Sequence, residues 1–178
     1  MRFGRKQSPD GRLKALARKI EAAAQKDQER ARKAREASRL RAVAAAELHT
    51  LCRTLAEALN GLLASPLVEL SPAEYSAAAF REDAPGVFQI NVSGRIVHLE
   101  FHATEGPSST EKLATPYILE GAVRAFNQEL LELSVIPEQH LFCCPQGGKL
   151  NWVWFDVRSQ RTAPLDRERL LSLLERLM

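Results

Sequence analysis

The chain has 178 residues, of which 45% are hydrophobic and 26% charged, and its formal net charge is +3 at pH 7. These values are typical of a soluble globular protein with one ordinary domain and an additional segment. No apolar run approaches the roughly 20 residues that a membrane-spanning helix needs. The three cysteines are an odd number, and Cys143 and Cys144 are adjacent, which fits a reducing compartment. We therefore expect a cytoplasmic protein.

The charge is distributed unevenly along the chain. Residues 1–41 hold fourteen Lys or Arg and five Asp or Glu, a net charge of +9, whereas residues 42–178 hold eleven and seventeen, a net charge of −6. Such an asymmetry between two parts of one chain predicts a basic arm attached to an acidic domain.

The first part of the chain predicts a long helix. Residues 1–12 are polar and basic, and we expect a flexible tail there. From Leu13 onward good helix formers dominate, and no Pro or Gly occurs before Gly61. A continuous helix over residues 13–63 would be about 76 Å long, so we expect residues 13–39 to project as a basic arm and residues 40–178 to form the domain.

Apolar residues return at helical spacing after Leu40. We expect this stripe to pack on the domain or on a second copy of the chain. Its candidate interface residues are Leu48, Leu51, Leu55 and Leu59.

The rest of the chain predicts alternating hairpins and helices. A short strand is expected over 66–70, and two hairpins over 87–101 and 138–157. Ser71, Pro72 and Glu74 match the start of a capped helix.

Two further helices are expected after these hairpins. One opens at Thr115 and Pro116, with apolar residues that recur at spacings of four and three: Leu119, Val123, Phe126, Leu130 and Leu133. The other closes the chain, with Leu170, Leu173, Leu174 and Leu177 facing inward. The predicted fold is α+β, with a long N-terminal basic helix and an antiparallel four- to five-stranded sheet covered by helices, in helix–hairpin–helix–hairpin–helix order.

This order of elements over about residues 40–178 resembles the type III secretion chaperone fold. The resemblance rests on topology alone and implies a dimeric domain.

Three polar residues of the first hairpin have side chains that can ligate zinc. His98, Glu100 and His102 alternate along one strand, so they lie on one face. However, the two histidines are about 13 Å apart along the strand, too far to share one ion easily. We expect a solvated sheet face that binds no metal, and a metal site at these three residues is the alternative.

The second hairpin contains a cysteine pair and a tryptophan pair. Cys144 could lie on the same face as His140, but no oxyanion hole or orienting group is identifiable, so structural cysteines are expected. If Val153, Phe155 and Val157 face the core, Trp152 and Trp154 face the other way, where they could stack bases, form a dimer interface or lie under the Leu40–Leu62 helix. We include both tryptophans in the candidate interface.

The basic segment 25–41 carries the functional hypothesis. Glu29 can pair with Lys33, and Glu36 with Arg32 and Arg39, but other cations remain uncompensated and would attract phosphates. A membrane-surface helix needs a large apolar face, which residues 21–39 lack, so nucleic acid is favoured and no membrane partner is expected. A solvated spacer helix remains the alternative. The candidate nucleic-acid-binding residues are Arg18, Lys19, Lys26, Arg30, Arg32, Lys33, Arg35, Arg39 and Arg41.

The sequence therefore predicts an accessory protein. It contains neither a GxxxxGK[ST] nor a GxGxxG motif, so we expect no cofactor, no catalytic residues and no enzyme activity. The domain is expected to bind a protein partner or a second copy, and the arm to contact nucleic acid within a larger assembly. The alternative is a dimeric chaperone or adaptor for a protein partner, with the arm as a coiled-coil handle.

Overall fold

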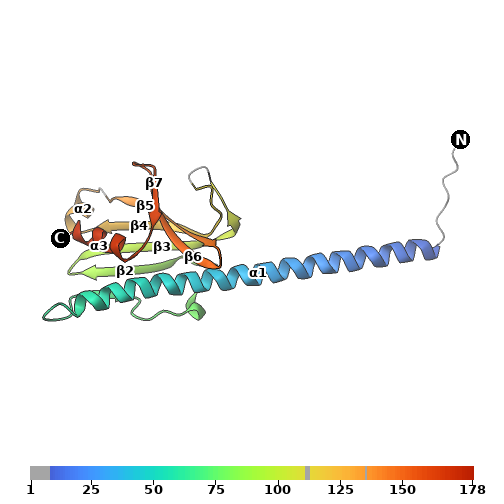
Figure 1. The fold of residues 1–178 in the computed structure, drawn as a ribbon, viewed down its shortest axis with the longest axis horizontal. Coiled ribbons are helices and arrows are strands. Elements are labelled where there is room, and N and C mark those ends of the chain that lie inside the picture. Colours follow the sequence, from blue (N-terminus) through green and yellow to red (C-terminus); the bar gives the residue numbers. More distant parts are fainter. Residues whose placement is uncertain (1–8, 111–112, 135) are drawn as a thin grey trace. The chain divides into compact units, whose positions relative to one another are not determined.

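The protein is described by a computed structural model that covers residues 9–110, 113–134 and 136–178 (Figure 1). The chain divides into two units, Met1–Ala37 and Ser38–Met178. Helix α1 (Pro9–Asn60) contributes residues to both. We describe each unit by itself.

Unit 1 consists, in its described part, of the first half of α1. The helix begins at Pro9, with Asp10 in its first turn, where a carboxylate interacts favourably with the helix dipole. Every residue from Pro9 to Glu36 is exposed. Residues 9–12 of the predicted flexible tail are thus helical, and residues 1–8 lie outside the described residues.

Unit 2 is built on one antiparallel sheet in which every strand pairs with its neighbour in the chain, in the order β1-β2-β3-β4-β5-β6-β7 (Figure 1). The seven strands are β1 (Val68–Ser71), β2 (Gly86–Val92), β3 (Arg95–Ser108), β4 (Tyr117–Phe126), β5 (Glu138–Gln146), β6 (Lys149–Asp156) and β7 (Arg161–Pro164). Besides α1, the helical elements are a 3-10 turn η1 (Ala77–Ala79), α2 (Gln128–Glu132) and α3 (Arg167–Glu175).

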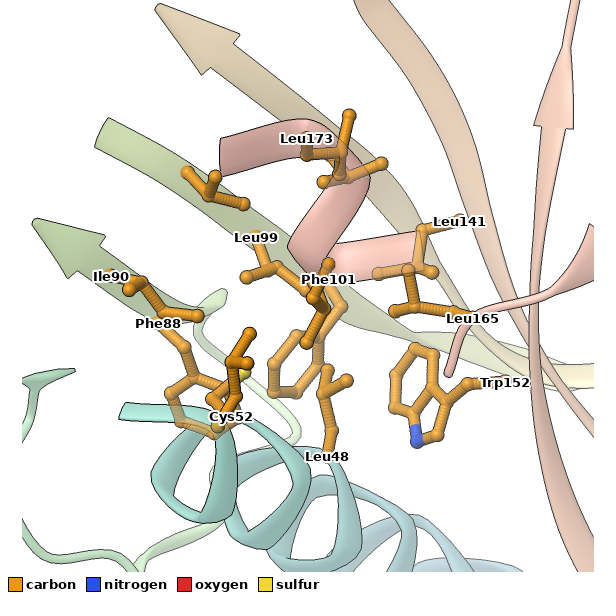
Figure 2. Close-up of a cluster of buried hydrophobic side chains, with 14 of the residues drawn as sticks. Leu48, Cys52, Phe88, Ile90, Leu99, Phe101, Leu141, Trp152, Leu165 and Leu173 are labelled. Atoms are coloured by element: carbon orange, nitrogen blue, oxygen red, sulfur yellow. The ribbon is translucent and has the colours of Figure 1, made fainter. Parts of the chain in front are cut away.

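The core lies between one face of the sheet and the helices α1 and α3. Figure 2 shows Leu48 and Cys52 of α1 opposite Leu99 and Phe101 of β3, with Leu173 of α3 close by. Leu170, Leu173, Leu174 and Leu177 are all buried, as predicted for the last helix. A smaller cluster of buried residues comprises Leu113, Tyr117, Phe142, Cys144 and Phe155.

Both predicted hairpins and the short first strand are confirmed. In the first hairpin Val92 pairs with Arg95 across Ser93 and Gly94, whose φ angles of 51° and 85° suit a tight two-residue turn. In the second, Gln146 pairs with Lys149 across Gly147 and Gly148, which also have positive φ.

The helix predicted from Thr115 is wrong, because residues 117–126 form strand β4. Leu119, Val123 and Ala125 are buried on the core face. The four-residue spacing of Leu119 and Val123, which suggested a helix, also satisfies strand alternation, whereas Phe126 does not follow it. Gly121 lies in the middle, where a Cβ atom would come within 1.8 Å of the Glu100 carbonyl oxygen. Glycine permits this close approach of β3 and β4 and also disfavours a helix.

The helix predicted from Ser71 is also wrong. Ser71 pairs with Gln89 in the sheet, so its backbone belongs to β1 and cannot open a helix. The only helical turn that follows in this stretch is η1. Tyr75 instead packs its ring against His49 and Phe88.

The predicted fold order therefore needs correction. The sheet has seven consecutive strands rather than four or five, and the only helix in the described residues between β4 and β5 is the five-residue α2. The chain does not follow a helix–hairpin–helix–hairpin–helix order, so the topology on which the type III secretion chaperone resemblance rested is not present in the described residues.

Candidate nucleic-acid interface

The candidate interface in unit 1 is the exposed surface of α1. Residues 9–37 contain nine Lys or Arg and five Asp or Glu, which gives a net charge of +4. All nine cations are exposed: Arg12, Lys14, Arg18, Lys19, Lys26, Arg30, Arg32, Lys33 and Arg35. No large apolar side chain occurs between Ile20 and Ala37, so this stretch has nothing to bury in a hydrophobic core.

Glu29 provides the carboxylate of both ion pairs found among the described residues of unit 1. Glu29 lies 2.9 Å from the Nη2 atom of Arg32 and 3.6 Å from the Nζ atom of Lys33, so the predicted Glu29–Lys33 pair is confirmed. Hydrogen bonding to Arg32 lowers the pKa of Glu29. The predicted pairs of Glu36 with Arg32 and Arg39 are not among the ion pairs of the described residues.

Four candidate cations have no carboxylate within ion-pairing distance in the part of the chain that the structure describes. They are Arg18, Lys19, Lys26 and Arg30. Arg35 donates its Nε–H to the Ala31 carbonyl and also lacks a carboxylate partner there. These cations keep their full charge for an external anion, because no described neighbour neutralises them.

The last two candidate cations belong to unit 2, and they differ from each other. Arg39 is exposed, but Arg41 is only 6% exposed. The Arg41 guanidinium donates to the Ile118 carbonyl at 3.1 Å, the Thr104 carbonyl at 2.5 Å and the Glu82 carboxylate at 2.8 Å. Arg41 therefore has protein acceptors for its guanidinium and, unlike the other candidate cations, is not exposed to an external phosphate.

The candidate interface leucines lie in or against the core of unit 2. Leu48 and Leu55 are buried, and Leu51 and Leu59 are partly buried and pack on the same cluster. The four leucines therefore pack on the domain of the same chain, which was one of the two predictions for this stripe. Contact with another chain stays a prediction for these residues.

Trp152 does not lie on an open sheet face. It is 7% exposed, and its ring packs edge-on against Phe101 (Figure 2). Its Nε1–H donates to the Ala44 carbonyl of α1 at 2.9 Å. Trp152 therefore lies under helix α1, which was one of the three positions considered from the sequence. The two faces of β6 are the reverse of the prediction. Trp152 faces the main core, whereas Phe155 belongs to the smaller cluster of buried residues and Val153 packs against that cluster.

Trp154 is half-buried and is covered by a cation. The Arg169 guanidinium lies 3.9 Å from the centre of its ring, and Arg169 also donates to the Gln139 side chain at 2.6 Å. Arg169 and the Arg41 partners Glu82 and Thr104 were not singled out from the sequence. Only the position of Arg169 in the predicted last helix, fifteen residues after Trp154, could have suggested that contact.

His98, Glu100 and His102 share the sheet face opposite the main core, as predicted. Their intervening neighbours Val97, Leu99 and Phe101 are fully buried. His98 Nδ1 contacts Gln89 at 2.8 Å, and His102 Nε2 lies 3.2 Å from Glu120. The two histidines thus have separate partners, and no group of three His, Cys, Asp or Glu in the described residues is arranged to hold a metal ion.

The charges on this sheet face compensate one another. Arg124 donates to Glu100 at 2.9 Å and to Glu138 at 2.6 Å, bridging β3 and β5 from the strand between them. The hydrogen bond from Arg124 lowers the pKa of Glu100 and raises the pKa of Arg124 itself. This face carries a closed ion-pair network, in contrast to the unpaired cations of unit 1.

The three cysteines are buried and free. Burial raises the pKa of Cys52 to about 12 and raises those of Cys143 and Cys144 as well. A thiol in such surroundings stays protonated at neutral pH and is a poor nucleophile. Their burial agrees with a structural role.

Comparison with protein-family models, with curated proteins and with solved structures found no match to the chain. No described helix is long and apolar enough to cross a membrane.

Proposed function

We propose that the protein is a non-enzymatic accessory protein whose basic helical arm binds the phosphate backbone of nucleic acid within a larger assembly. The observation that carries this proposal is the exposed cation surplus on α1 of unit 1. Seven of its nine cations lack a carboxylate partner in the described residues, and the four acidic side chains beyond Glu29 do not pair with any of them at ion-pair distance.

The physical basis is counterion release. Cations on a helix displace the ions condensed on nucleic acid, and the affinity then falls steeply with salt. Such binding is independent of sequence, because contacts to phosphates carry no base information.

A matched pair of full-length variants tests this function. The first variant replaces Lys26, Arg30, Lys33 and Arg35 with Gln, and the control replaces four exposed cations of unit 2, Lys149, Arg158, Arg161 and Arg167, with Gln. Both variants lose the same net charge, so any difference reports the position of the cations. Binding to a labelled nucleic acid is measured by fluorescence anisotropy from about 50 to 200 mM salt.

We expect the arm variant to lose most of its affinity at low salt. The slope of log K against log salt should fall by about 3 to 4, at roughly 0.9 per lost phosphate contact. The control variant should keep the wild-type slope to within about 0.9, the change expected for one phosphate contact. Equal losses in both variants, or no binding by the wild-type protein at about 50 mM salt, would refute the proposal.

A second candidate function has weaker support. Leu13, Leu16 and Ile20 are 64%, 54% and 60% exposed at coiled-coil spacing, which favours an adaptor with the arm as a helical handle. The pattern lasts little more than one heptad, because Ala23, Asp27 and Arg30 occupy its next positions, whereas a coiled coil needs about three to four heptads. Light scattering that shows a dimer in the wild-type protein and a monomer after Leu13→Ser and Leu16→Ser would favour this function instead.

A further inference from the structure

The cations of unit 1 are arranged on two opposite sides of α1. With about 3.6 residues per turn, Lys26, Arg30 and Lys33 follow one another at spacings of four and three and lie along one side. Arg32 and Arg35 lie along the opposite side. All five side chains are exposed, so both sides can reach a ligand. Arg32 and Lys33 are paired with Glu29, and each would exchange this exposed ion pair for a phosphate on binding.

The two surfaces between these sides differ in kind. One carries Ala24, Asp27, Ala31 and Ala34, again at spacings of three and four, so its side chains are short. The other carries the carboxylates Glu29 and Glu36, seven residues apart. An anionic ligand that contacts both cationic sides is therefore expected to meet the short-side-chain surface and to leave the two glutamates facing away.

This arrangement matches the dimensions of the DNA major groove. An α-helix with its side chains is about 10–12 Å across, and the groove of B-form DNA is about 12 Å wide with a phosphate backbone on each rim. Short side chains let the helix approach the floor of the groove, while cations on its two sides reach the two strands. Continuous basic helices are known to bind DNA in this way.

Other nucleic acids fit these residues less well. Duplex RNA has a deep and narrow major groove that side chains do not read. Single-strand binders stack bases on aromatic side chains, and residues 9–37 contain no aromatic residue. Resting on the proposed nucleic-acid function, we propose that the ligand of the arm is duplex DNA, with residues 24–36 lying in the major groove and both strands contacted through their phosphates.

The first experiment compares three probes of equal length and sequence on the full-length protein: a 20-base-pair DNA duplex, the single DNA strand and the RNA duplex. We expect the DNA duplex to bind about tenfold or more tightly than either of the others at the same salt concentration. Equal or tighter binding to RNA or to the single strand overturns the duplex-DNA inference and leaves the proposed function standing. Binding to none of the probes overturns both.

The second experiment tests the two-sided geometry. One variant carries Lys26→Gln and Arg30→Gln, and the other carries Arg32→Gln and Arg35→Gln. Each should lower the salt slope for the DNA duplex by about 2, because each removes two phosphate contacts. A loss confined to one variant means that the helix lies along a single strand, which overturns the groove geometry.

A third pair of variants reports which surface faces the DNA. Asp27→Ala and Glu36→Ala change the net charge equally, but only Asp27 lies between the cationic sides on the short-side-chain surface. Asp27→Ala should tighten binding by about tenfold and Glu36→Ala by no more than about twofold, because nearby charges interact more strongly than distant ones. The opposite ranking overturns the proposed orientation.

Discussion

The two halves of helix α1 use the same residue types for different purposes. In unit 1 the leucines at 13 and 16 and the arginine at 30 are exposed, whereas in unit 2 Leu48, Leu55 and Arg41 are buried. The helix geometry is the same on both sides of Ala37. What differs is the burial of these side chains, because in unit 2 they pack on the sheet of the same unit.

Arginine illustrates the difference most directly. Arg41 has three described acceptors and acts as a structural cation that ties α1 to the carbonyls of β3 and β4. Arg30 has no carboxylate partner in the described residues, so its charge is available to a ligand. A cation without a partner is therefore better evidence for function here than a cation in a network.

The largest expected effect on stability concerns Trp152, which packs against the buried half of α1. Trp152→Ala should lower the free energy of unfolding by about 3 to 5 kcal/mol, because it removes a buried ring and the hydrogen bond to the Ala44 carbonyl. Trp154→Ala is the control, and its half-buried ring should cost about 1 to 2 kcal/mol. Urea unfolding followed by circular dichroism measures both. Equal costs would show that Trp152 does not anchor α1.

A second pair of substitutions compares the two arginines directly. Arg41→Met should cost roughly 2 to 4 kcal/mol, because the Thr104 carbonyl and the Glu82 carboxylate lose a charged donor. Arg30→Met should stay within about 0.5 kcal/mol, as expected for an exposed side chain. The same urea experiment applies. A destabilising Arg30→Met would mean that the first half of α1 is not a solvated arm.

The smallest expected effect concerns the paired cation Arg124. The pKa of Glu100 is lowered from its ordinary value of 4.5, so this pair contributes stability above that pH and loses it as the pH falls through the lowered value. Because the Glu100 side chain is 39% exposed, the contribution should be below about 1 kcal/mol. Arg124→Met should therefore be less stable than wild type at about pH 6, and this difference should shrink at about pH 3.

Arg161→Met, at an exposed position of β7, is the control for this pH dependence. It should remain parallel to wild type at both pH values. An Arg124→Met variant whose stability difference is the same at both pH values would show that the Glu100 pair contributes nothing.

The local patterns predicted several elements correctly, and their limits are physical. The hairpin turns at Ser93-Gly94 and Gly147-Gly148 have local signals, so both hairpins could be predicted. The strand at 117–126 could not be distinguished from a helix by apolar spacing, because Leu119 and Val123 satisfy both periods. Gly121 was the one local signal against the helix, since glycine disfavours a helix interior.

The candidate site was predictable where it is local and not where it depends on distant contacts. The exposure of the cations from Lys26 to Arg35 follows from the absence of large apolar neighbours in the sequence. The burial of Arg41 depends on Thr104 and Ile118, which are 63 and 77 residues away in the chain. No local pattern could have assigned those partners.

The contact between Ala44 and Trp152 has a consequence for how the protein is made. The two residues are 108 positions apart, and the ribosome adds roughly 5 to 20 residues per second. Ala44, on the inner face of α1, therefore emerges roughly 5 to 20 seconds before Trp152 of β6, which completes the cover of this face. During that interval a nascent chain must keep this apolar face away from neighbouring chains, so slower translation should increase its dependence on chaperones.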